Sequence, residues 1–321
     1  MLALLALALL FSPTNTLRFT SVTVAAPPST QKFLISALDL KPCPSIAKLN
    51  NRSQKSTKSS DSDESDDSSS PSSAFSRDNV RISFVNAPSS STTSSTSLPP
   101  SPSVVSLSIG GLSFSPPPPP INVYGSTTLT FDDCSATGPL PPLAPGLTFD
   151  HIVGNVRSLS SASDRIRSLW PSALPPLSKF ASFTAAEVGT PRSGLNSDVL
   201  NPEETSVLLP LNEPVDATEK SQVSTFLDYM GEESVQHVAF KVDDVVEEVE
   251  RMRGEGVEFL DPPPDRYYEK AREVAGGRIT DERWEDVMRL GILVDVETSS
   301  VGEGMLMQIF TKPFSSGPEG G

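Results

Sequence analysis

The chain has 321 residues, a formal net charge of −15 and a sequence pI near 4.6. Nucleic-acid phosphates are met by Lys and Arg, so an acidic chain predicts no nucleic-acid partner. Its two cysteines, Cys43 and Cys134, stand far apart and form no Cys-x-x-Cys pair. This spacing argues against a disulfide framework or a thiolate zinc site, and it favours a reducing compartment such as the cytoplasm.

Residues 1–11 form a leucine-rich apolar run with two interpretations. The first is a secretory signal over 1–26, with a cleavage point near Ala26, although the positively charged start of such signals is missing. The second is a buried strand or helix. The run is too short to cross a bilayer as a helix, so we expect no stable membrane span.

Composition divides the chain into three zones. Residues 1–49 hold short apolar stretches that are too short to bury a core alone, and we interpret them as the remnant of a first domain or as the signal. Residues 50–120 are rich in Ser, Asp and Pro and are expected to be mostly disordered. Within that zone, 80–85 and 104–114 alternate apolar and polar residues, which predicts strands. Residues 121–321 have the composition of a packed domain.

Two similar series of elements are expected in the third zone. After a strand with a turn at Gly125, the first series has a strand at 147–156, a helix at 164–169 and strands at 180–188, 195–200 and 206–211. The second has a strand at 234–242, a helix at 244–253 with Asp244 as N-cap, a short strand at 257–260, helices at 267–274 and 284–290, and a strand at 304–311. This repetition predicts an internal duplication.

The chain has only two histidines, His151 and His237, and each lies in the first strand of one series. If the two series pair, both imidazoles can face one cavity, because side chains alternate along strands. Imidazole suits iron, zinc, copper and nickel, and two histidines with one carboxylate are typical of iron(II) oxygenases. A lone strand histidine is more often a core or surface residue, and the pattern alone leaves the metal open.

A series of sequence blocks resembles the 4-hydroxyphenylpyruvate dioxygenase family. The blocks stand in the family's order and spacing: FDHIVGNV at 149–156, SGLNS at 193–197, LLPLNEP at 208–214, KSQ at 220–222, VQH at 235–237, GILVD at 291–295 and LMQIFTKP at 306–313. The resemblance covers 121–313 well and 80–120 only faintly. The same blocks fit glyoxalase-like relatives of the same fold poorly.

The resemblance implies an α+β fold of paired βαβββ modules, the vicinal-oxygen-chelate or glyoxalase-like half-open barrel. His151 and His237 are then the iron(II) ligands in a catalytic-type domain over 121–321. It further implies that six residues line the substrate pocket: Ser197, Pro210, Asn212, Gln222, Gln308 and Phe310. Without the family, these residues could equally cap turns, face water or fill a core.

The implied activity converts 4-hydroxyphenylpyruvate and O2 to homogentisate and CO2, in the catabolism of tyrosine and phenylalanine. The partners are then a small 2-oxo acid and O2, and family members commonly self-associate. A hydroxymandelate synthase-like product is an alternative, because that branch shares most of these blocks.

The family's third ligand is a glutamate that would fall one to three residues beyond Gly321, so we expect a chain cut at both ends with an incomplete iron site and little turnover. Glu319 could serve only if the tail folded back. A catalytically inactive relative that acts as a binding or interaction protein is the other alternative.

Overall fold

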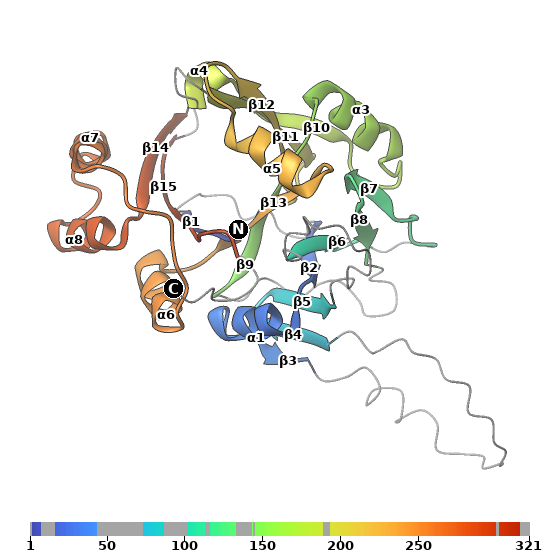
Figure 1. The fold of residues 1–321 in the computed structure, drawn as a ribbon, viewed down its shortest axis with the longest axis horizontal. Coiled ribbons are helices and arrows are strands. Elements are labelled where there is room, and N and C mark those ends of the chain that lie inside the picture. Colours follow the sequence, from blue (N-terminus) through green and yellow to red (C-terminus); the bar gives the residue numbers. More distant parts are fainter. Residues whose placement is uncertain are drawn as a thin grey trace, which may run out of the picture.

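The computed structural model describes residues 2–7, 17–43, 73–86, 102–112, 116–132, 143, 145–188, 193–299 and 302–314. Within these ranges the chain forms a seven-stranded and an eight-stranded sheet, with helices packed against both (Figure 1). The low-complexity stretches at 44–72 and 87–101 lie outside the described residues, as do 315–321, which include Glu319.

The seven-stranded sheet is built from residues 18–131. Its order is β3-β4-β5-β2-β6-β8-β7, and α1 (Pro28–Ala37) follows β2. The strands are β2 (Arg18–Ala25), β3 (Lys41–Pro42), β4 (Ser73–Arg77), β5 (Val80–Val85), β6 (Ser103–Gly110), β7 (Ile121–Tyr124) and β8 (Thr127–Phe131). The strand predicted at 80–85 is confirmed as β5, and the one predicted at 104–114 is present as β6, which already ends at Gly110. The apolar stretches before residue 49 pack in the same core as β5 to β8, so they do not stand alone.

The predicted turn at Gly125 is confirmed, since this residue has a φ of +50° and joins β7 to β8. Because β8 pairs in parallel with β6, the segment 121–131 belongs to the seven-stranded sheet. The change from one sheet to the other therefore falls after Phe131, whereas the sequence placed the start of the catalytic-type domain at residue 121.

The first histidine module occupies one half of the eight-stranded sheet, in the order β10-β11-β12-β9. Its elements are β9 (Thr148–Asn155), α3 (Leu159–Leu169), β10 (Leu177–Phe183), α4 (Ala185–Val188), β11 (Ser193–Pro202) and β12 (Leu209–Asp216), and α5 (Gln222–Met230) follows. Two expectations were wrong in detail. The strand predicted at 180–188 ends at Phe183 and continues as α4, and the helix predicted at 164–169 already begins at Leu159, because Ser158 caps it through the Ser161 amide.

The second histidine module occupies the other half of this sheet. Its elements are β13 (Ser234–Lys241), α6 (Val245–Gly254), α7 (Asp265–Ala275), α8 (Asp281–Leu290), β14 (Leu293–Ser299) and β15 (Gly302–Phe310). The predicted cap of α6 is confirmed, because the Asp244 carboxylate accepts from the amides of Val246 and Glu247. The strand predicted at 257–260 is only an isolated bridge between Phe259 and Thr311.

A strand from the start of the chain, β1 (Leu2–Leu7), lies between β13 and β15 (Figure 1). It runs parallel to β13 and antiparallel to β15, as β12 does to β9 and β11. Its register sets Ala3 beside Ala239 and Phe310, and Leu5 beside Lys241 and Gln308. Of the two interpretations of the apolar run, residues 2–7 thus form a strand, and 8–11 lie outside the described residues.

The two faces of the eight-stranded sheet differ in what covers them. One face carries residues such as Ile152, Leu211 and Ile309, which join a large apolar core shared with the helices and the seven-stranded sheet. On the opposite face, Ala239 packs with Leu306 and Phe310 in a small apolar cluster that is separate from the large core. We call this second face the inner face. Among the described residues, no helix has the length and apolarity needed to cross a membrane.

Candidate metal centre

The structure brings the two histidines together. His151 on β9 and His237 on β13 lie on antiparallel neighbouring strands, and their ring centres are 5.5 Å apart at an angle of 74°. Two imidazoles that bind one ion through nitrogen atoms at about 2.1 Å have ring centres about 5 Å apart. The separation therefore suits a shared cation.

The residue before each histidine sets its tautomer. His151 Nδ1 lies 2.7 Å from the Asp150 carboxylate, and His237 Nδ1 lies 2.8 Å from the Gln236 side-chain oxygen. Both partner atoms only accept hydrogen bonds, so each Nδ1 carries the proton and each Nε2 keeps its lone pair. Metal-binding histidines are commonly oriented in this way by a second hydrogen bond.

His237 is buried, with 8% of its surface exposed. Burial, followed by the proximity of His151, holds the pKa of His237 well below its ordinary value of 6.5. The ring is therefore neutral at pH 7, which is the form that binds a metal ion.

These two nitrogens fit a transition-metal ion at two coordination positions. Within the described part of the chain, no group of three or more His, Cys, Asp or Glu side chains could hold a metal ion. Among the described residues, the donor set that could hold an ion is thus this pair of imidazoles.

Two predicted pocket residues on β15 lie near this centre or in line with it. The Phe310 ring is 5.5 Å from the His237 ring at 86°, an edge-to-face contact that places an apolar ring beside the two histidines. Gln308 stands two residues before Phe310 on the same face, and its amide donates to Asp295 on β14 over 2.8 Å.

Three other predicted pocket residues share the inner face on the first module. Ser197 pairs with Asn212 across β11 and β12, and Val199 pairs with Pro210. Their neighbours Leu209 and Leu211 belong to the large core on the opposite face, so alternation along β12 turns Pro210 and Asn212 inward.

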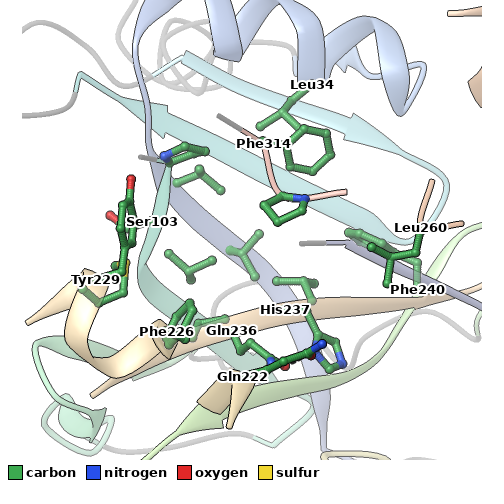
Figure 2. A pocket seen from close by; sticks show the side chains of 18 of the residues that line it. Leu34, Ser103, Gln222, Phe226, Tyr229, Gln236, His237, Phe240, Leu260 and Phe314 are labelled. Carbon is green, nitrogen blue, oxygen red and sulfur yellow. Dashed lines mark hydrogen bonds between the residues drawn. The ribbon is translucent and has the colours of Figure 1, made fainter. Parts of the chain in front are cut away.

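Gln222, the sixth predicted residue, begins α5 after the N-cap Ser221. Together with His237 and Gln236 it lines a cavity of about 670 Å³ between the two sheets. Figure 2 shows these three polar residues at one end of the cavity, with Leu34 and Phe314 at the other. The other five predicted pocket residues and His151 do not line this cavity.

Sequence reasoning missed two kinds of site residue. Asp150 and Gln236 orient the histidines, and the only signal was that a polar residue directly precedes each of them. Part of the apolar wall of the cavity comes from β2, β5 and the α1 region, and no local pattern connects these segments to the histidines; the residues are Val22, Val24, Leu34, Leu38 and Ile82.

Comparisons with known proteins agree with this fold. Residues 181–283 match the Glyoxalase/Bleomycin resistance protein/Dioxygenase superfamily. A variant of 4-hydroxymandelate synthase from Streptomyces coelicolor superposes with a TM-score of 0.63 at 18% identity, covering 92% of this chain and 87% of that one. A xylose isomerase-like TIM barrel/4-hydroxyphenylpyruvate dioxygenase fusion protein gives 0.59 at 16% identity, covering 96% and 49%. The chain is thus an α+β protein of the glyoxalase-like, vicinal-oxygen-chelate class, as the sequence predicted.

Sequence relatives are more specific. The chain is 43% identical over 179 residues to 4-hydroxyphenylpyruvate dioxygenase from Hordeum vulgare, covering 54% of this chain and 39% of the relative. It is 38% identical over 183 residues to the Arabidopsis thaliana protein (55% and 39%) and 35% identical over 172 residues to the Sus scrofa protein (53% and 42%). The resemblance seen in the sequence blocks is confirmed: the chain is similar in sequence to proteins named 4-hydroxyphenylpyruvate dioxygenase. It spans less than half the length of these relatives.

Proposed function

We propose that this chain is a 4-hydroxyphenylpyruvate dioxygenase-type oxidoreductase that depends on Fe(II). The proposed reaction converts 4-hydroxyphenylpyruvate and O2 to homogentisate and CO2, a step of tyrosine and phenylalanine catabolism. The observation that supports it most directly is the pair of facing imidazoles, each with Nδ1 occupied and Nε2 free, in a chain whose relatives carry that name.

His151 and His237 would hold the iron ion. When bound, the ion would activate O2, while the electrons that reduce O2 come from the substrate, through oxidative decarboxylation of the 2-oxo acid and hydroxylation of its ring. The reaction balances, because one oxygen atom enters the new side-chain carboxylate and the other enters the ring hydroxyl, while the original carboxylate leaves as CO2.

The chain's own residues would bind and orient the substrate. Phe310 provides an apolar wall for the aromatic ring, and its edge-to-face contact with His237 holds the wall beside the ligands. We further propose Ser197, Pro210, Asn212, Gln222 and Gln308 as lining residues, with the polar ones binding oxygen atoms of the substrate. Burial of His237 keeps water away from the ligand and strengthens these polar contacts.

The test is a homogentisate assay with added Fe(II) and O2, in which products are identified by mass. We expect a low yield of homogentisate from the unaltered chain, in line with an incomplete iron site, and none from His151→Ala or His237→Ala. Hydroxymandelate instead of homogentisate would favour the synthase-like alternative. Tight substrate binding with no product from the iron-loaded chain would replace the enzyme assignment with that of a binding protein.

We also propose a cytoplasmic location and small-molecule partners, the 2-oxo acid and O2, with self-association as in the family. Cys43 is a free thiol, which suits a reducing compartment. Sedimentation at several protein concentrations would test self-association.

A further inference from the structure

Four polar residues form one continuous row across four neighbouring strands. Ser197 on β11 pairs with Asn212 on β12, Asn212 pairs with Asn155 on β9, and Asn155 pairs with Ser234 on β13. Side chains of residues that pair directly across strands point to the same face. The row therefore follows the inner face from one histidine module into the other.

The orientation of Asn155 is fixed by its neighbour. A side chain at Gly154 would collide with the Tyr124 ring of the seven-stranded sheet, so position 154 faces that sheet. Alternation then turns Asn155 to the inner face, the face of Val153, which pairs with His237.

Two members of the row are buried and have polar atoms without a partner among the described residues. Asn155 is fully buried, and neither its Nδ2 nor its Oδ1 forms a hydrogen bond. Ser234 is 5% exposed, and its Oγ also has no partner. A buried polar group that stays without a hydrogen bond destabilises the folded state. Nearly all buried polar groups in folded proteins are paired, so these atoms call for a polar partner other than the described residues, such as a bound ligand.

The row is covered by α5, which packs against β9, β12 and β13. The buried side chains of this helix are Val223 and Leu227, and neither can form a side-chain hydrogen bond. A site between the apolar side chains of α5 and the polar row would hold a small hydrogen-bonding group away from bulk water.

The row lies at a suitable distance from the metal centre. Asn155 follows His151 by four residues on one strand, which corresponds to about 13 Å between their Cα atoms at about 3.3 Å per residue. Both residues lie on the inner face of β9, so an aryl 2-oxo acid held at the histidines and lying along this face would point the far end of its ring toward the row.

We propose that Asn155 and Ser234 bind the ring hydroxyl of the substrate, together with the lining residues Ser197 and Asn212. A phenol both donates and accepts: Asn155 Oδ1 can accept its proton, while Asn155 Nδ2 or the Ser234 hydroxyl donates to its oxygen. The inference rests on the proposed function and deepens it, since it assigns the residues that select hydroxylated over plain aryl substrates. Sites that pair a substrate hydroxyl discriminate strongly against analogues without it.

The experiment compares binding of 4-hydroxyphenylpyruvate and phenylpyruvate to the Co(II)-loaded chain without O2, by calorimetry. We expect the unaltered chain to prefer the hydroxylated acid, and Ser234→Ala to reduce that preference about tenfold. Ser163→Ala is the matched control, because Ser163 on α3 is also a buried serine with an unpaired hydroxyl, outside the row. Asn155→Ser is a second variant that retains a small polar side chain, and it should also reduce the preference.

The outcomes separate the two proposals. If Ser234→Ala and Asn155→Ser weaken the binding of both acids equally, or change the binding of neither, the row has a structural role. This inference is then overturned while the proposed function stands. If the unaltered chain binds neither acid, the proposed function fails and the inference fails with it. Thermal unfolding of each metal-free variant shows whether a loss of binding follows from a loss of folding.

Discussion

The two histidine modules have the same strand plan, but they obtain the fourth strand of that plan from different places. In the first module β12 follows β11 directly in the sequence, whereas in the second the corresponding position beside β15 is filled by β1. The registers agree residue by residue: Ser197 pairs with Asn212 as Gln308 pairs with Leu5, and Val199 pairs with Pro210 as Phe310 pairs with Ala3. The place of a strand in a sheet is thus defined by the neighbouring strands with which it pairs, not by its order along the chain.

Because of this difference, the two halves of the inner face differ in polarity. The fourth strand of the first module brings Asn212 into line with Ser197 and Asn155, which gives a polar half. In the second module, Ala239 and Phe310 form an apolar cluster on the inner face. A substrate with one hydroxyl on an aromatic ring matches such a surface, because its ring can contact the apolar half while its hydroxyl meets the polar half.

The largest predicted effect tests whether the two modules contribute equally to the metal centre. His151→Ala or His237→Ala should each weaken Co(II) binding about 1000-fold, or about 4 kcal/mol, because each leaves a single imidazole. Calorimetric titration at pH 7.5 gives the affinities. Asp150→Asn serves as the graded control with a smaller loss of about tenfold, since it alters only the orientation of His151. Retention of the unaltered affinity by either alanine variant would show that the two modules do not share one ion.

A second prediction concerns the position three residues after each histidine, on the face of the sheet opposite to the inner face. The first module has Gly154 there and the second has Phe240. A Cβ at Gly154 would lie 2.1 Å from the buried Tyr124 ring, so Gly154→Ala should lower the free energy of unfolding by about 3 kcal/mol. Gly254→Ala is the control, because a Cβ there meets nothing within 4 Å and should change stability by less than about 1 kcal/mol. Urea unfolding measures both, and equal stability of the two variants would contradict the close packing of the first module on Tyr124.

The third prediction concerns a polar contact between the second module and the seven-stranded sheet. Glu248 on α6 is 6% exposed and accepts two hydrogen bonds from Arg77 of β4, at 2.6 and 2.9 Å, and two from Arg251, at 2.6 and 3.3 Å. Burial alone would raise the pKa of Glu248, but the hydrogen bonds from Arg77 and Arg251 outweigh it and hold the pKa below its ordinary value. Glu248→Gln should therefore cost about 2 kcal/mol at pH 7.

The pH dependence of that cost follows from the lowered pKa. A carboxylate with a lowered pKa in the folded state stabilises fully above the ordinary value of 4.5 and loses this contribution as the pH falls toward the folded-state pKa. The gap in stability between Glu248→Gln and the unaltered chain should therefore be largest at pH 7 and shrink below about pH 4. The control is Glu250→Gln, an exposed residue paired with Arg289, with a change under about 1 kcal/mol. A gap that does not vary with pH would contradict the ion pair.

Local patterns were enough where a segment's own residues decide its structure. Strict alternation predicted β5, and Asp244 before an apolar helical stripe predicted α6. The alternating pattern failed at Ala185–Val188, where alanine and glutamate favour a helical turn once the strand has left its partner.

Distant pairing was not predictable from these patterns. Nothing in the apolar run at 2–7 indicates that its partners are β13 and β15, more than 200 residues away. The two histidines and most of the lining residues could be proposed from the family resemblance. Asn155 and Ser234 could not, because their missing hydrogen bonds become visible only when four strands are in register.

The smallest predicted effect asks whether β1 is a true counterpart of β12. Ala3 and Ala6 are the same residue type at two register positions of β1. Ala3 pairs with Phe310, which belongs to the inner-face cluster, and Ala6 pairs with Met307, which belongs to the large core. Ala3→Glu puts a carboxylate at the strand position that pairs with Ala239 and Phe310, and it should tighten Co(II) binding about tenfold, or about 1.4 kcal/mol. Ala6→Glu has the same change of composition and should give no gain.

Amide hydrogen exchange of the unaltered chain tests the same strand without any substitution. Because β1 is hydrogen-bonded on both sides, the amides of residues 2–7 should exchange as slowly as those of β13, although residue 2 is near the chain terminus. Free exchange throughout 2–7, or equal metal affinities of Ala3→Glu and Ala6→Glu, would mean that the first module alone has a complete set of four strands. In that case the edges of β13 and β15 would be open to a strand from elsewhere, since paired edges are the reason for a strand at this position.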